Sequence, residues 1–174
     1  LETGNKAPSI QRLPVSDKLQ NIAESFSELA ENKKLNYRLD IETGIEWNTD
    51  ISCFNKIANN LISNAFKYTP EKGNITIGLK IENQQLILRV SNSGKGIAKE
   101  NLNKVFDRYK ILDSVELNGK NSRNGLGLAI CKNMVTLLNG EITIESIPDE
   151  ITTFTVTLPE LSPAEQEKPR EVYQ

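Results

Sequence analysis

The sequence predicts an α+β domain in which a sheet is covered on one face by helices. Two long helical patterns, over residues 50–69 and 124–140, are separated by a hairpin of strictly alternating apolar residues, and a second pair of strands follows the later helix. The 174 residues fit one domain with one core. We therefore expect a two-layer arrangement of sheet and helices.

Composition and charge exclude several classes of function. Twenty-one Lys and Arg against 23 Asp and Glu leave a net charge of -2, which indicates neither a non-specific nucleic-acid binder nor a membrane-surface binder. No apolar run approaches the roughly 20 residues of a membrane span, and the chain does not open on a signal-peptide pattern. The absence of histidine excludes a Ser-His-Asp triad, a Cys-His pair and histidine metal ligands within this chain.

The two cysteines indicate a reducing compartment. Cys53 and Cys131 both lie inside helical patterns and stand at no metal-ligand spacing. We interpret them as reduced core residues, which places the domain in the cytoplasm.

Three parts divide the chain by composition. Residues 1–14 mix Gly, Asn, Pro and Ser with few apolar positions, which predicts a linker from something upstream. Residues 15–160 carry the periodic patterns of a folded domain. Residues 161–174 are charged, bear proline and hold few large apolar side chains, which predicts a disordered tail or an onward linker.

Structure is expected to begin after Pro14. Ser16 or Asp17 can cap a helix that runs through Glu31 with apolar residues at helical spacing. Residues 36–41 then predict a short strand, and Thr43-Gly44 follows as a turn.

The predicted helix over residues 50–69 organises the rest of the chain. Thr49 or Asp50 can cap it, and Pro70 ends it because proline lacks an amide proton and disfavours helix in the residue before it. Its buried face consists of Ile51, Phe54, Ile57, Ala58, Leu61, Ile62 and Ala65.

A second, polar stripe lies beside this apolar face. It consists of Asn60, Asn64 and Lys67, about a third of a turn from the centre of the apolar face. Two carboxamides and an ammonium at the edge of a core form either an ordinary helix shoulder or the wall of a site.

A hairpin and a glycine turn follow. Residues 75–81 and 86–90 alternate between apolar and polar around a polar turn, which predicts a β-hairpin with one buried face. The second strand runs into SNSGKGI, where Gly94 and Gly96 allow positive φ or close approach of a ligand. This segment is either a tight strand-to-helix turn or part of a binding site.

The remaining patterns add a loop and a glycine-led helix. Residues 99–106 predict a short helix, and residues 111–124 a mobile loop long enough to suggest a function. The glycine-rich start of the helix over 124–140 offers unpaired amide protons, for which phosphate is the natural partner. Strands are expected at 141–146 and 152–158.

Four segments together resemble a known family. NNLISNAFKYTP resembles the N box, SNSGKGI the first glycine box, VFDRY the F box and NGLGLAI the second glycine box of the catalytic ATP-binding domain of sensor histidine kinases. This is the GHKL superfamily, shared with DNA gyrase, heat-shock protein ninety and the mismatch-repair ATPase subunit. The boxes stand in family order, and the likeness runs from about Pro14 to Pro159. It implies the Bergerat fold, a two-layer α/β sandwich of a mixed sheet and about three helices, which binds ATP with Mg²⁺ beneath a mobile lid.

The resemblance implies roles for the polar stripe. Asn64 would ligate Mg²⁺ through its side-chain oxygen, as suits a hard cation, and Asn60 would support it one turn earlier. Lys67 would offer its ammonium to the phosphates, and Tyr68 would pack near the adenine or ribose. The implied catalytic residues are Asn60, Lys67 and Lys110.

The resemblance also implies the remaining nucleotide contacts. Asn92 would read the adenine, while Gly94 and Gly96 let the base come close. Gly125 and Gly127 would give backbone amides to the phosphates. The full expected set is Asn60, Asn64, Lys67, Tyr68, Asn92, Gly94, Gly96, Ile97, Arg108, Tyr109, Arg123, Gly125, Leu126, Gly127 and Leu128, with Leu126 and Leu128 anchoring the lid to the core.

The chain departs from the family at several positions. Asn92 stands where the family usually has aspartate, so a charge-assisted hydrogen bond is lost and affinity is expected to fall by about a factor of ten. Ile111 stands where the family often has arginine. Either Lys110 or Arg108 reaches the γ-phosphate instead, or neither residue does. Arg123 replaces a glycine and either stiffens the lid, reaches a phosphate or is solvated.

The missing histidine shapes the functional hypothesis. We expect the chain to bind Mg·ATP and to donate the γ-phosphate to a histidine on a separate, dimeric helical domain upstream, which makes it a kinase domain of a two-component system. A response-regulator receiver domain is the expected downstream partner, in the hybrid arrangement if the tail leads on to it. The whole protein is expected in the inner membrane, with this domain in the cytoplasm and no nucleic-acid partner.

Two alternatives stay open. A stand-alone serine kinase of the anti-sigma-factor type shares the boxes and needs no histidine. A degenerate nucleotide-sensing or docking module is compatible with Asn92 and Ile111.

Overall fold

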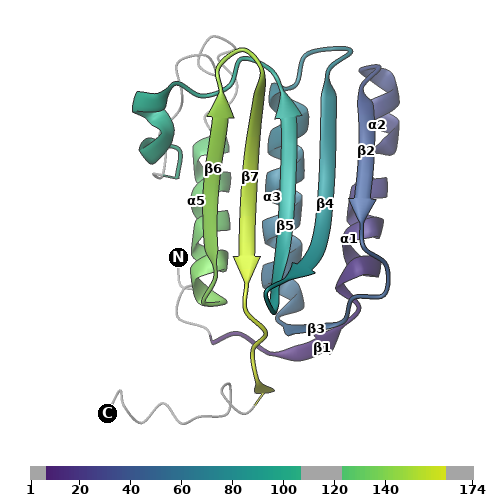
Figure 1. The fold of residues 1–174 in the computed structure, drawn as a ribbon, viewed down its shortest axis with the longest axis vertical. Coiled ribbons are helices and arrows are strands. Elements are labelled where there is room, and N and C mark those ends of the chain that lie inside the picture. Colours follow the sequence, from purple (N-terminus) through teal and green to yellow (C-terminus); the bar gives the residue numbers. More distant parts are fainter. Residues whose placement is uncertain (1–6, 107–122, 164–174) are drawn as a thin grey trace.

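The fold is a two-layer sandwich of one mixed sheet and one layer of helices (Figure 1). The computed structural model describes residues 7–106 and 123–163. The main sheet has the strand order β2-β4-β5-β7-β6. Its strands are β2 (Asn36–Ile41), β4 (Asn74–Glu82), β5 (Gln85–Ser93), β6 (Glu141–Ile147) and β7 (Ile151–Leu158). β2 and β4 are parallel and the other neighbours antiparallel, which confirms the predicted mixed sheet.

The helices lie together behind one face of this sheet in the view of Figure 1. They are α1 (Val15–Glu24), α2 (Ser27–Asn32), α3 (Ile51–Tyr68) and α5 (Arg123–Leu137), and a 3-10 helix, η2 (Lys99–Lys104), lies beyond the edge strand β6. No helix of the described ranges combines the length and apolarity that crossing a bilayer would require.

The core lies between the two layers. The hairpin strands and β7 contribute alternate residues, and those on β7 are Phe154, Val156 and Leu158, all at most 2% exposed. Ile81, expected on the buried face of the hairpin, is instead 42% exposed near the end of β4. α3 contributes its whole apolar stripe, with Phe54, Ile57, Leu61 and Ile62 fully buried. The predicted hairpin is confirmed, and its two turn residues, Asn83 and Gln84, both have positive φ, as a two-residue turn requires.

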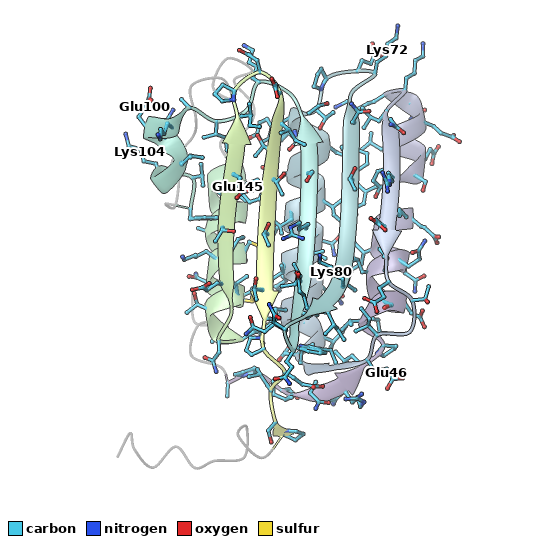
Figure 2. All side chains as sticks on the ribbon, in the orientation of Figure 1. Glu46, Lys72, Lys80, Glu100, Lys104 and Glu145 are labelled. Atoms are coloured by element: carbon cyan, nitrogen blue, oxygen red, sulfur yellow. The ribbon has the colours of Figure 1, made fainter. Side chains whose placement is uncertain are left out.

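The other face of the sheet is polar and open. Figure 2 shows Lys80 on β4 and Glu145 on β6 projecting from this face. Ser91 on β5 and Thr153 on β7 share a hydrogen bond of 2.9 Å across it. The helices therefore cover one face only, as predicted.

A small ribbon joins the beginning and the end of the described chain. β1 (Gln11–Leu13) pairs antiparallel with β3 (Trp47–Thr49). The Arg12 guanidinium bridges Glu46 at 3.2 Å and Glu160 at 3.1 Å, and the Leu161 amide donates to the Asn48 carbonyl at 3.1 Å. The expectation that structure begins after Pro14 is thus wrong, because residues 10–13 pack here and Ile10 and Leu13 are buried.

The predicted first helix is interrupted. α1 ends at Glu24 and α2 begins at Ser27. Ser25 Oγ donates to the Ile22 carbonyl, and the turn directs Phe26 onto Phe66 of α3, with ring centroids 5.1 Å apart. Ser16 does not cap α1, because its hydroxyl donates to the Glu42 carbonyl and accepts from the Ile45 amide instead.

α3 has the predicted bounds and two separate caps. At its start, Asp50 accepts from the Cys53 amide at 2.9 Å and from the Ser9 amide at 2.6 Å. At its end, Lys33 Nζ donates to the carbonyls of Phe66 at 2.7 Å and Thr69 at 2.8 Å.

Some expectations fall on residues outside the described ranges. They are residues 111–122 of the expected loop and residues 164–174 of the expected tail, which stay predictions. At the edges of both segments the expectation is wrong, because α5 already begins at Arg123 and Leu161 is buried with its amide bonded to β3. The short helix expected over 99–106 is present as η2, in the tighter 3-10 form.

Candidate functional site

The polar stripe of α3 forms the first wall of the site. Asn60, Asn64 and Tyr68 are half-buried and recur every four residues, so they line one side of the helix. Neither the Asn60 nor the Asn64 carboxamide makes a hydrogen bond with any residue that the structure describes. The exposed Asn59 side chain, by contrast, donates to the Asn55 carbonyl at 3.0 Å. Two half-buried amides that find no hydrogen-bond partner within residues 7–106 and 123–163 are available to a ligand.

Lys67 lies at the other edge of this stripe. It is exposed, and together with Phe66 and Ser63 it lines a groove on the side of α2. The structure thus places Lys67, which the sequence grouped with Asn60 and Asn64, beside this groove, and its expected phosphate contact stays a prediction.

α5 forms the second wall, opposite the stripe. α3 and α5 pack against each other, and a Cβ built on Gly127 would stand 3.5 Å from Asn60 Oδ1. Leu128 follows with 9% of its surface exposed, as expected for an anchor in the core. The second glycine box thus lies directly against the N box.

The start of α5 carries Arg123, Gly125 and Leu126, whose side chains are outside the described part of the structure. The first four amides of any α-helix lack an intrahelical acceptor. Gly125 lies in the first described turn of α5, and the phosphate contacts expected of the Gly125 and Gly127 amides stay predictions.

The first glycine box closes the end of the site near the C-terminus of α3. A Cβ on Gly94 would stand 3.0 Å from the Tyr68 carbonyl oxygen, so only glycine lets this loop approach α3 so closely. Gly96 has φ of +77°, and its Cβ would stand 2.8 Å from Ser146 Oγ. Both glycines of the box are therefore required by the backbone.

Asn92 ends β5 beside this loop and is buried, with 7% of its surface exposed. Its Nδ2 donates to the Ser93 carbonyl at 2.9 Å, which leaves the side-chain oxygen as an acceptor. Across the sheet its register partner is Thr152 on β7, itself 5% exposed.

Thr152 and Ser146 belong to the site but were missed from the sequence. Ser146 Oγ lies 3.1 Å from Thr152 Oγ1 and accepts from the Ile97 amide at 2.8 Å, so the two hydroxyls tie the glycine box to β6 and β7. The sequence did contain one signal for them. Thr152 places a hydroxyl on the same face of β7 as the apolar residues Phe154 and Val156.

The turn between β6 and β7 holds the glycine loop from outside. The Asp149 amide donates to the Lys95 carbonyl at 2.7 Å, and the Gly94 amide donates to the Glu150 carbonyl at 3.3 Å. The loop and the hairpin tip therefore form one unit.

The F box is described only at its start. Val105 is buried, Phe106 lies edge-on to Phe154 with centroids 6.3 Å apart, and Lys132 Nζ of α5 lies 5.5 Å from the Phe106 ring centre. Arg108, Tyr109 and Lys110 lie outside the described residues, so their expected phosphate contacts remain predictions.

The donor set determines which metal the site fits. Within the described ranges, no group of three or more His, Cys, Asp or Glu side chains could hold an ion. The carboxamide oxygens of Asn60 and Asn64 are hard donors, too few to enclose Ca²⁺ but suited to Mg²⁺, which keeps several waters and shares phosphate ligands.

Comparisons with known proteins agree with this geometry. Residues 49–162 match the family model described as histidine kinase-, DNA gyrase B- and HSP90-like ATPase. Histidine kinase P4 of Formosa agariphila is 37% identical over 145 residues, which are 81% of this chain and 10% of that protein. The sensor histidine kinase WalK of Bacillus subtilis is 42% identical over 106 residues, which are 60% of this chain and 17% of that protein.

Solved structures agree on the fold. The catalytic domain of the histidine kinase ThkA superposes with a TM-score of 0.76 over 90% of this chain and 98% of that one, at 20% identity. At that identity the likeness shows the fold alone. The chain spans between a tenth and a fifth of the lengths of the two curated relatives named above. The matched family model and these relatives together show that the chain belongs to the family of histidine kinase-, DNA gyrase B- and HSP90-like ATPases.

Proposed function

We propose that this domain binds Mg·ATP between α3 and α5 and donates the γ-phosphate to a histidine on a separate helical domain of the same protein. The observation that carries the proposal is a pair of carboxamides, Asn60 and Asn64, that have no hydrogen-bond partner among the described residues, with Asn60 facing Gly127 of α5. Family membership and the named kinase relatives support it. Full-length ShkA, similar in fold, has been solved in complex with AMPPNP.

The residues of this chain position the nucleotide. The Asn92 side-chain oxygen accepts from the adenine amino group, and the glycine box lets the base reach it. The backbone amides of Gly125 and Gly127, in the first turns of α5, hold the phosphates. Asn64, supported by Asn60, holds Mg²⁺, which when bound neutralises phosphate charge. Lys67 reaches the phosphates when it leaves its groove.

Positioning and charge neutralisation are what phosphoryl transfer chiefly requires. The bond from the γ-phosphorus to the β,γ-bridging oxygen breaks, and a bond to the acceptor nitrogen forms, leaving ADP. Since this chain contains no histidine, the acceptor comes from another domain.

Two measurements test the proposal. Calorimetric titration of the 174-residue chain should show binding of MgATP and MgADP at or below millimolar concentration, and no binding would refute the nucleotide site. Joining the upstream helical domain should yield phosphohistidine from labelled ATP. Phosphoserine on a small partner protein would favour the serine-kinase alternative instead.

The wider setting is part of the same proposal. ThkA has been solved in complex with the response regulator protein TrrA, and we extend this to a receiver domain as the downstream partner here. We place the domain in the cytoplasm, as part of an inner-membrane sensor kinase.

A further inference from the structure

A groove that the nucleotide site does not use lies between α2 and α3. It encloses about 360 Å³ and is lined by Phe26, Leu29, Lys33, Ser63, Phe66 and Lys67. This volume lies within the range of binding pockets. The groove therefore offers room for several side chains of a partner.

The floor of the groove is apolar and rigid. Phe26 stacks on Phe66 with an interplanar angle of 24°, and Tyr37 packs edge-on to Phe66 from behind at 5.1 Å. Leu29 also lines the groove, and this large apolar residue has 43% of its surface exposed to solvent. A preformed aromatic floor with an exposed leucine is typical of a surface that receives apolar side chains of a helix.

The charge of the groove determines which helix it fits. The charged side chains that line it within the described ranges are Lys33 and Lys67, both cationic. Lys33 is fixed, because its Nζ is bonded to two carbonyls at the end of α3. An occupant that presents leucines to the floor and carboxylates to these lysines matches both the shape and the charge, although the whole chain is slightly acidic.

The groove also touches the nucleotide site through one residue. Lys67 lines the groove, while the row formed by Asn60 and Asn64 runs along the adjacent side of the same helix. A carboxylate seated in the groove would hold the Lys67 ammonium on that side and away from the phosphates.

We propose that the α2–α3 groove docks an amphipathic helix that carries carboxylates beside its apolar ridge, and that this docking weakens MgATP binding through Lys67. The second half rests on the proposed nucleotide site, and the first does not. Because coupling between two sites is reciprocal, MgATP should weaken helix docking by the same factor.

The test uses the 174-residue chain and a stapled helical peptide of about 14 residues with leucines four apart and flanking glutamates. Fluorescence anisotropy of the labelled peptide should show saturable binding. A peptide with lysines in place of the glutamates, and one with serines in place of the leucines, should each bind at least about tenfold more weakly.

Matched variants locate the contact. Leu29→Glu should weaken binding of the glutamate peptide about tenfold, whereas Ile81→Glu, at a similarly exposed position of β4 with 42% exposure, should leave it unchanged. Equal binding of the glutamate and lysine peptides, no binding, or equal effects of the two variants would overturn the docking proposal. A dimer of the chain that Leu29→Glu dissociates would make a second copy the occupant and would equally overturn it.

Calorimetry then tests the coupling. Saturating glutamate peptide should weaken MgATP binding about fivefold or more. Unchanged MgATP affinity with bound peptide would refute the coupling alone. Absence of MgATP binding without peptide would refute the proposed function and leave the docking result standing.

Discussion

Asn60 on α3 and Gly127 on α5 face each other so closely that a Cβ on the glycine would lie 3.5 Å from the asparagine Oδ1. That distance is an ordinary van der Waals contact, so the protein itself would accept a methyl group there. Among the described residues this space is therefore not needed for packing, which agrees with the proposal that Asn60 and Asn64 bind a ligand there.

Gly127→Ala should consequently separate stability from binding. Alanine favours a helix interior over glycine by about 1 kcal/mol, so the melting temperature should stay or rise. MgATP affinity should fall several-fold, measured by calorimetry. If the variant binds MgATP like the original chain, the gap beside Asn60 is not part of the site.

Asn64→Ala tests the metal ligand. Because the Asn64 carboxamide has no hydrogen-bond partner among the described residues, its loss should change the free energy of unfolding by less than about 0.5 kcal/mol. Binding of ATP should lose its dependence on Mg²⁺. Asn59→Ala is the matched control on the exposed side of the helix. Unfolding of Asn64→Ala would instead indicate a structural asparagine.

Asn92→Asp should strengthen nucleotide binding. A carboxylate accepts the adenine amino group about 1 kcal/mol more strongly than an amide oxygen, which corresponds to roughly tenfold in affinity. The same carboxylate is buried in the free domain and should lower its thermal stability. A gain in ATP affinity without any phosphotransfer from the joined two-domain protein would favour the nucleotide-sensing alternative.

Lys33→Met removes a cap that spans two helices. The ammonium of Lys33 satisfies the carbonyls of Phe66 and Thr69, so the variant should lose about 2 kcal/mol in urea unfolding. Lys34→Met, next along the chain with an exposed side chain, should lose almost nothing. Equal losses of stability in the two variants would show that positive charge near α3 stabilises the domain and that the two hydrogen bonds do not.

Alkaline pH should destabilise the domain through its thiols. Burial raises the pKa of Cys131 from 9.0 to about 12, and burial together with Asp50 raises the pKa of Cys53 to about 11. Above pH 9 the unfolded chain therefore loses protons that the folded chain keeps, so this stability is full below pH 9 and falls as pH rises through about 11 for Cys53 and about 12 for Cys131.

The measurement compares urea unfolding at pH 8 and pH 10. The two thiols should together cost about 2 kcal/mol over this interval. Cys131→Ala should show a smaller pH-dependent loss than the original chain. An identical loss in both would assign the effect to other groups.

The long elements could be predicted because their signals are local. Asp50 and Pro70 bound α3 through a cap and a missing amide proton, and the period-two pattern of residues 75–90 determines which face of the hairpin is buried. The break at Ser25 could not be predicted, since Phe26 turns there to reach Phe66, forty residues later. β1 and β3 are three residues each and depend on mutual pairing, which leaves no periodicity to detect.

The candidate site likewise has one part that could be predicted from the sequence and one part that could not. The glycines and asparagines of the boxes could be named because residue type and spacing carry their chemistry. That Thr152 lies opposite Asn92 depends on strand register, and that Lys67 lines the α2 side depends on helix packing. Neither relation is contained in a single segment.

The β1–β3 ribbon has a mechanical consequence. The segment that leads into the domain and the segment that follows β7 are both bonded to β3, through β1 and through residues 159–161. Tension applied between these two segments would pass through β3 and shear that ribbon first. The five-stranded sheet and the walls formed by α3 and α5 lie outside this load path, so a pull on the ends would leave the nucleotide site undeformed.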